Sequence, residues 1–196
     1  VPVKWDAEDY NWTTQLPGHG HGSPVIVGER LYVVCGQKRT AERIVVCVDV
    51  GSGKVLWKRP FPSKKHRLHG SNSYGSSTPA ADSDGVVVTW ADPGKLTLMA
   101  LDRTGKTAWE RDFGPHTAIN GAGTSPIIVD DLVVLTNVQM DPNFMIRIGV
   151  LPKTYPDKTV HDSFLVAVDR KSGKTVWQVK RKTYLAGYAT PCVRTL

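Results

Sequence analysis

Four short, glycine-rich segments hold the residues of this chain whose side chains could do chemistry. Their imidazole, amide and phenol groups supply hydrogen-bond donors and acceptors or metal ligands. Glycine beside them allows the backbone to approach a ligand closely. The candidate ligand-binding residues are His19, His21, His69, Asn72, Tyr74, His116 and Asn120.

The histidines in these segments admit two interpretations. Imidazole is a common zinc ligand, and His19 and His21 are separated by a single glycine. However, no further ligand stands at a fixed spacing from this pair, as zinc sites usually require. The interpretation we favour is that the histidines form hydrogen bonds at the rim of a tightly packed channel. Metal binding remains open at this stage.

Several kinds of catalytic or cofactor site lack a sequence signature here. The chain has no serine triad in a recognisable context, no phosphate-binding glycine loop and no paired zinc cysteines. Its 3 cysteines include Cys35 and Cys47 on neighbouring predicted strands. In a hairpin closed around residues 36–43, Cys35 would face about Ile44, so no disulfide is expected. We assign no catalytic residue. Whether the chain is an enzyme stays open, and we favour the interpretation that it is not.

The basic composition is not accompanied by a nucleic-acid-binding motif. Lys and Arg total 25 against 18 Asp and Glu, a formal net charge of +7. The cations are spread over predicted turns, with local clusters only at residues 64–67 and 180–182. A solvated surface is the interpretation we favour, with weak binding to acidic polymers as the alternative. No apolar run approaches the ~20 residues that would span a membrane.

One motif occurs three times, at residues 47–57, 100–109 and 167–177. Each copy runs from a small residue through an aspartate and a glycine turn to a tryptophan. Short runs of β-branched and aromatic residues separated by turn residues surround each copy, which predicts four strands per copy. No amphipathic helical period is present. The structural residues of the motif are Asp49, Trp57, Asp102, Trp109, Asp169 and Trp177.

Units of four short antiparallel strands, repeating about every 40 to 50 residues, are typical of β-propeller blades. We therefore predict an all-β chain, a partial β-propeller of three complete four-stranded antiparallel blades plus flanking strands, in one domain. In a propeller, the loops entering successive inner strands emerge on one face, which would gather the candidate residues at the channel mouth. The predicted divisions are an outer strand of the ring-closing type and entry loop at 1–22, blades at 23–62, 78–114 and 125–182, and the first strand of another blade at 190–196.

The longest predicted loop, residues 137–162, falls in the third unit and on the same face. It contains Met140, Phe144, Met145 and Tyr155. Loops of this length are often functional. Its apolar residues suggest either a lid or partner-docking patch, or a cover for the neighbouring blade.

The repeated pattern, Ala-x-Asp-x-x-Thr-Gly-Lys-x-x-Trp, resembles the tryptophan-docking motif of the pyrroloquinoline-quinone-like (PQQ-like, quinoprotein-type) β-propeller family. The resemblance implies that each tryptophan packs against the next blade and that the aspartate and glycine hold a turn. It also implies an exported, periplasmic bacterial protein and a ring of seven or eight blades. We therefore expect either a fragment of a longer polypeptide, which we favour, or edge-to-edge pairing of two copies.

The resemblance leaves three functions open. The first, which we favour, is a noncatalytic scaffold in the bacterial cell envelope, similar to the propeller lipoprotein of outer-membrane assembly, with a protein partner and no cofactor. The second is a quinoprotein dehydrogenase using PQQ and calcium. However, the adjacent cysteines and the carboxylate cluster that such enzymes use are missing from this sequence. The third is a propeller that binds a carbohydrate or another small polar ligand at the channel mouth.

Overall fold

The computed structural model describes residues 3–92, 94–118, 120–155, 157–183 and 187–194. It contains three four-stranded antiparallel sheets, each with its strands in chain order, which confirms the predicted fold class. Blade 1 consists of β1 (Val25–Val27), β2 (Arg30–Gly36), β3 (Arg43–Asp49) and β4 (Val55–Phe61). Blade 2 consists of β5 (Ala80–Asp82), β6 (Gly85–Asp92), β7 (Lys95–Asp102) and β8 (Thr107–Asp112). Blade 3 consists of β9 (Ile127–Val129), β10 (Leu132–Asn137), β11 (Ser163–Asp169) and β12 (Thr175–Arg181).

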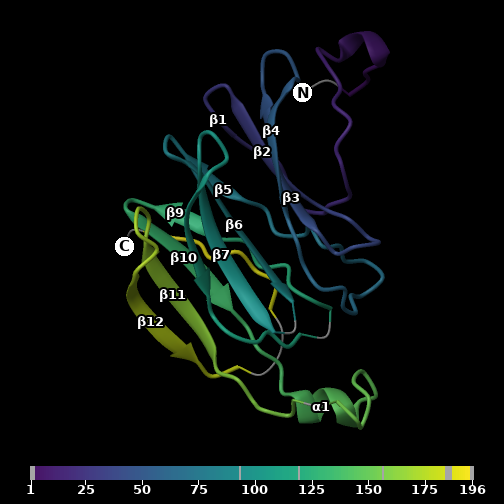
Figure 1. The fold of residues 1–196 in the computed structure, drawn as a ribbon, viewed down its shortest axis with the longest axis vertical. Coiled ribbons are helices and arrows are strands. Elements are labelled where there is room, and N and C mark those ends of the chain that lie inside the picture. The colour runs from purple at the N-terminus through teal and green to yellow at the C-terminus, as the bar shows by residue number, and fades with distance from the viewer. Residues whose placement is uncertain (1–2, 93, 119, 156, 184–186, 195–196) are drawn as a thin grey trace.

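The three blades are arranged side by side as an open arc, with the N-terminus beside blade 1 and the C-terminus beside blade 3 (Figure 1). The short first strands β1, β5 and β9 contact one another in turn. They therefore form the inner edge of the arc, and the longer strands extend outward from it.

The core lies between the blades. Side chains on one face of blade 1 pack against blade 2, and the opposite face of blade 2 packs against blade 3. The middle strands β6 and β7 are thus covered on both faces and almost wholly buried. This explains why their sequences are nearly continuous apolar runs instead of alternating patterns.

The repeated motif forms the same local structure in every blade. The pairing register shifts between Cys47 and Val48, and at the equivalent positions of the other blades, because one residue of the outer strand, Leu56 in blade 1, has no partner and forms a β-bulge. After the shift, the tryptophan lies opposite the small first residue of the motif, as Trp109 lies opposite Ala100. A small residue is therefore needed there to leave space for the indole ring.

Each docked tryptophan reaches the turn of the next blade. The indole Nε1–H of Trp57 donates to the carbonyl of Arg103 at 2.9 Å, and that of Trp109 donates to the carbonyl of Arg170 at 2.9 Å. The rings lie over Gly105 and Gly173, where an added Cβ would be 2.9 and 2.7 Å from the indole. Trp177 occupies the same position in blade 3 but is 37% exposed, against 8% for Trp109.

The residues before blade 1 differ from expectation. Residues 11–18 form no strand, although Trp12 still docks on blade 1 and donates to the carbonyl of Val50 at 2.7 Å. A strand requires a hydrogen-bonded neighbour, whereas a docked indole holds the segment through its side chain alone. Of the segment 190–196, residues 190–194 also form no strand, and the last two residues lie outside the described part of the chain.

Two short helices accompany the strands in the described part of the chain, and the sequence pattern had not predicted them. The short 3-10 helix η1 (Ala7–Asp9) lies near the N-terminus, and α1 (Pro142–Arg147) lies in the long loop 137–162. Both are too short to show a repeating apolar pattern. The available signal for α1 was its start, because Asp141 caps the helix through the backbone N–H of Asn143 and is followed by proline.

Candidate functional site

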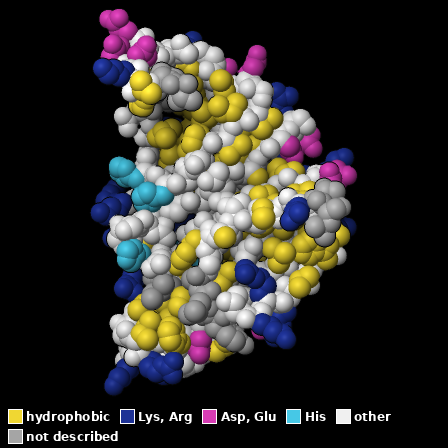
Figure 2. All heavy atoms as spheres, turned by 180° about the vertical axis from the view of Figure 1, so that it is seen from behind, with side chains coloured by type: hydrophobic (Ala, Val, Ile, Leu, Met, Phe, Trp, Pro, Cys, Tyr) yellow, Lys and Arg dark blue, Asp and Glu magenta, His cyan; other side chains and the backbone are white. Residues whose placement is uncertain are grey.

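Most of the predicted site residues line one open cavity of about 570 Å³, called here the mouth cavity. Five of the seven are His19, His21, His69, Asn72 and Tyr74. Lys38, Lys65 and His66 also line it, and the sequence analysis did not select them. Figure 2 shows histidines gathered with Lys and Arg side chains along the left edge of the face that it draws.

Glycine and histidine alternate over residues 18–22, so the glycines face one side of the segment and the two histidines face the other. A Cβ at Gly18 would lie 2.7 Å from the carbonyl oxygen of Gly36, and one at Gly20 would lie 2.7 Å from that of Val34. The glycines therefore face the neighbouring backbone, where no side chain fits. His19 and His21 project the other way and are exposed. Backbone bonds fix the segment, since His19 N–H donates to Gly36 at 3.0 Å and His21 N–H to Gly75 at 3.0 Å.

Tyr74 forms the buried wall of the mouth cavity. Its hydroxyl donates to the backbone carbonyl of His66 at 2.7 Å and accepts from the backbone N–H of the same residue at 3.2 Å. The two rings meet edge to face at 5.1 Å between centroids. The Arg43 guanidinium lies 4.9 Å from the centroid of the Tyr74 ring. Tyr74 thus connects an exposed cavity to a buried cation.

Asn72 holds two loops together instead of facing the cavity with free groups, and Asn120, which is not among the residues lining the mouth cavity, takes part through its backbone carbonyl. The Asn72 amide donates to the backbone carbonyls of Asn120 and, at 3.3 Å, of Ala122. Its amide oxygen accepts from the backbone N–H of Ser73 at 2.7 Å and from the hydroxyl of Ser76. With both ends of the amide engaged, Asn72 ties the loop before blade 2 to the loop before blade 3.

His116 does not line the mouth cavity with the other candidate residues. It lines a separate cavity of about 160 Å³ with Asp92 and Tyr155, and His66 lies between the two cavities. The His116 Nδ1 lies 3.1 Å from the amide oxygen of Asn137. Because that oxygen only accepts, the Nδ1 carries the proton and the Nε2 is left as an acceptor. Burial lowers the pKa of His116, so the ring is held neutral.

Part of the long loop 137–162 packs against this second cavity. Met145 of α1 is buried, and Met145, Leu151 and Tyr155 contribute to the cavity wall. The carbonyl of Val150 accepts from the guanidinium of Arg67 at 3.0 Å, which links the loop to the segment before blade 2. These contacts show the loop covering its neighbouring blades, which was one of the two roles predicted for it.

The mouth cavity is rich in cations and nitrogen donors. Of its lining residues among those described, none carries a carboxylate or a thiol. The described part of the chain also contains no group of three or more His, Cys, Asp and Glu side chains arranged to hold a metal ion. Cys35 and Cys47 are free and buried in different core clusters on the two faces of blade 1, and Cys35 pairs with Ile44 as predicted. The arrangement can donate hydrogen bonds and attract acceptors.

Comparison with known proteins assigns the chain to a protein family. A PQQ-like repeat family described as "Outer membrane protein assembly factor BamB" matches residues 4–183. The chain belongs to this family. The match confirms the resemblance drawn from the repeated tryptophan motif. Comparison with curated protein sequences finds no match.

Solved structures of similar fold are propeller proteins. A europium-containing methanol dehydrogenase is 16% identical with a TM-score of 0.54, and the alignment covers 83% of this chain and 25% of that one. The quinohemoprotein alcohol dehydrogenase from Comamonas testosteroni is 17% identical with a TM-score of 0.54, covering 83% and 21%. BamB from Moraxella catarrhalis is 16% identical with a TM-score of 0.47, covering 86% and 54%. This chain therefore spans a quarter or less of the two dehydrogenases and about half of that BamB.

At such low identity, the two dehydrogenase structures show the propeller fold and nothing about this family member's activity. In the described residues of the chain, no helix is both long and apolar enough to cross a membrane. The site residues that sequence reasoning missed, Lys38, Lys65 and His66, lie in loops without a repeated motif. Only Lys65 and His66 gave a signal, as part of the basic cluster at residues 64–67.

Proposed function

We propose that this chain is part of a noncatalytic PQQ-like propeller of the bacterial cell envelope that binds a protein partner through the mouth cavity. The observation that supports this most directly is the composition of the cavity, which contains hydrogen-bond donors and cations but no carboxylate or thiol among its described lining residues. A catalytic histidine is usually oriented by a third group such as a carboxylate, and the described lining residues supply none. The family, described as an outer membrane protein assembly factor, supports a protein-binding role and an exported location.

The residues of the mouth cavity do not fit a calcium-bound quinone. Calcium takes six to eight oxygen ligands, with carboxylates prominent among them. The cavity offers the imidazoles of His19, His21 and His69 and the ammonium groups of Lys38 and Lys65. Ammonium groups repel a divalent cation, and imidazole nitrogen is a poor ligand for it. The mouth cavity is therefore unsuited to holding PQQ through a calcium ion.

A small polar ligand, such as a carbohydrate, is the second candidate at the same cavity. Its volume of about 570 Å³ falls within the usual size of small-molecule sites. A protein partner is favoured because the cavity is open and its histidines stand exposed on the surface.

The test uses the purified protein incubated with PQQ and calcium, then separated from free cofactor. We expect no quinone absorbance and no stoichiometric calcium in the protein fraction. In parallel, a photo-crosslinking amino acid at His21 should give a specific protein adduct in envelope membranes, while the same group at Lys171 should not. Stoichiometric quinone and calcium, with dye reduction on addition of an alcohol, would overturn the proposal.

A further inference from the structure

We propose that the mouth cavity recognises an acidic peptide segment, with the carboxylates of Asp or Glu side chains as the recognised groups. This inference rests on the proposed function and names the chemistry of the partner. It is carried by two rim cations without partners, a buried cation behind the cavity wall, and the kinds of donor that point outward.

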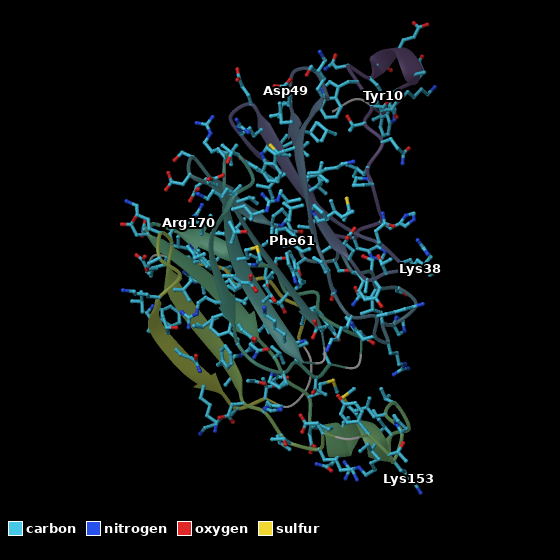
Figure 3. The ribbon with its side chains drawn as sticks, in the orientation of Figure 1. Tyr10, Lys38, Asp49, Phe61, Lys153 and Arg170 are labelled. Atoms are coloured by element: carbon cyan, nitrogen blue, oxygen red, sulfur yellow. The ribbon has the colours of Figure 1, made fainter. Side chains whose placement is uncertain are left out.

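The two rim cations are Lys38, in the β2–β3 loop, and Lys65, before blade 2. Both are exposed. Neither ammonium group forms an ion pair or hydrogen bond within the described residues, and no carboxylate lines the cavity between them. Figure 3 shows Lys38 projecting from the edge of blade 1 into solvent. The two charges are therefore available to a ligand.

The buried cation is Arg43, whose side chain is almost fully enclosed, at 2% exposure. Its guanidinium donates to the carbonyl of Ala41 at 2.9 Å, to that of Ala91 at 2.8 Å and to the hydroxyl of Ser63. None of these acceptors is charged, and the Nε has no hydrogen-bond partner. The carboxylate of Asp92 acts on the Arg43 charge through space but forms no ion pair with it. A buried charge without a contacting counter-ion is costly, and its field is weakly screened.

This unpaired guanidinium lies directly behind the mouth cavity. Arg43 lines a very small void, about 10 Å³, that shares Leu68, Ser73 and Tyr74 with the mouth cavity. The guanidinium lies over the Tyr74 ring, 4.9 Å from its centroid, and Tyr74 also lines the mouth cavity. A ligand carboxylate in the cavity would add a second negative charge near Arg43, beside that of Asp92, which acts on it without forming an ion pair.

The tautomer of His69 provides a further hydrogen-bond donor that a ligand can reach. The Nδ1 of His69 accepts from the backbone N–H of Ser71 at 3.2 Å, so its proton resides on Nε2. His69 is exposed on the cavity, and its Nε2–H is therefore available to a carboxylate oxygen. A charge-assisted bond of this kind is stronger than a neutral one.

The same geometry disfavours nucleic acid as the anion. Single strands bind through aromatic rings on which bases stack. Tyr74, the aromatic ring of the mouth cavity, is 8% exposed and is contacted by Arg43 and by the edge of His66. No exposed Phe, Tyr or Trp ring is therefore available for base stacking among the described lining residues.

The experiment measures binding of fluorescein-labelled hexaglutamate to the full chain by anisotropy at low and moderate salt. We expect binding that weakens about tenfold in the double variant Lys38→Gln, Lys65→Gln, because two charge contacts are lost. The matched control, Lys54→Gln with Lys171→Gln, removes two exposed lysines in the β3–β4 and β11–β12 turns. It should change affinity less than twofold. In Arg43→Lys, which keeps the charge, binding should be retained better than in Arg43→Met.

The outcomes separate the alternatives. Equal losses in the two lysine pairs would show attraction to net charge and overturn the inference. Equal or tighter binding of a hexathymidylate of the same label would overturn it in favour of nucleic acid. Should hexaglutamate fail to bind while the envelope crosslink at His21 persists, the acidic ligand is wrong but the proposed function stands. Stoichiometric quinone and calcium would instead remove the proposed function itself.

Discussion

The tryptophan-docking contact between blades 2 and 3 can be tested by one added methyl group. Gly173 has φ of +68°, and a Cβ there would lie 2.7 Å from two carbons of the Trp109 ring. Gly28 has φ of +57° and no atom within 4 Å of its added Cβ. Both substitutions to alanine place an L side chain in the left-handed region, which costs about 1–2 kcal/mol in each case. The difference between the two variants therefore isolates the contact with the indole.

The magnitude of that difference follows from what the methyl group displaces. Moving the ring breaks the bond from the Trp109 Nε1–H to the Arg170 carbonyl, which is worth about 1 kcal/mol. Trp109 is 8% exposed, and a tryptophan buries about 150–250 Å². Re-exposing roughly a third of that area costs about 1.5–2 kcal/mol at ~25 cal/mol per Å². We expect Gly173→Ala to be destabilised by about 3 kcal/mol more than Gly28→Ala.

The assay is urea unfolding at equilibrium, followed by tryptophan fluorescence and by far-ultraviolet circular dichroism. Agreement of the two probes checks that unfolding is two-state. Equal losses of unfolding free energy in Gly173→Ala and Gly28→Ala would refute the reasoning, since they would show that the indole does not need the space over Gly173.

Three further predictions concern stability. In the 196-residue chain, Trp109→Ala should lower the unfolding free energy by about 3–5 kcal/mol and Trp177→Ala by less than about 1 kcal/mol, because Trp109 is buried and Trp177 is 37% exposed. Urea unfolding measures both losses, and similar losses in the two variants would contradict the prediction. Asp82→Asn should cost about 2–3 kcal/mol at neutral pH, because Arg170 of blade 3 donates two hydrogen bonds to this carboxylate at 2.6 and 2.7 Å and its own side chain is only 8% exposed. Burial acts to raise the pKa of Asp82, but the Arg170 hydrogen bonds and charge outweigh it and lower the pKa, so this stability should persist at neutral pH and disappear as the carboxylate is protonated in acid. Burial lowers the pKa of His116 below its usual 6.5, so near pH 6 the unfolded chain binds a proton that the folded chain does not. The unfolding free energy should therefore fall from pH 7 to pH 5. The variant His116→Gln should make this fall smaller.

Local patterns predicted the blades well. The motif from Cys47 to Trp57 specified a strand, a turn and a strand, because its aspartate accepts turn N–H groups and its glycine adopts positive φ. The placement of Cys35 opposite Ile44 was also predicted, since the register of a hairpin follows from the length of its loop. The helix α1 was missed because six residues cannot display a periodic apolar face.

The candidate site was predicted only in part. Histidines 19, 21 and 69 share the mouth cavity, and their position before inner strands predicted this neighbourhood. His116 lines a different cavity, whose wall includes Met145 and Tyr155 of the long loop, and His66 borders both cavities. The sequence could not identify three cations as members of the site, namely Lys38, Lys65 and Arg43. Nothing in the local sequence distinguishes a cation that has a partner from one that has none.

The sequence by itself determined the repeating unit, because strand, turn and docking tryptophan depend on residues close together in the chain. The tertiary structure alone decided which donors share a cavity and which charges remain unpaired. Arg43 illustrates the difference: its sequence position places it at the start of β3, but its contacts come from Ala41, Ser63, Tyr74 and Ala91. The sequence alone tells that such a side chain is charged. Whether a partner neutralises that charge depends on segments that folding brings together.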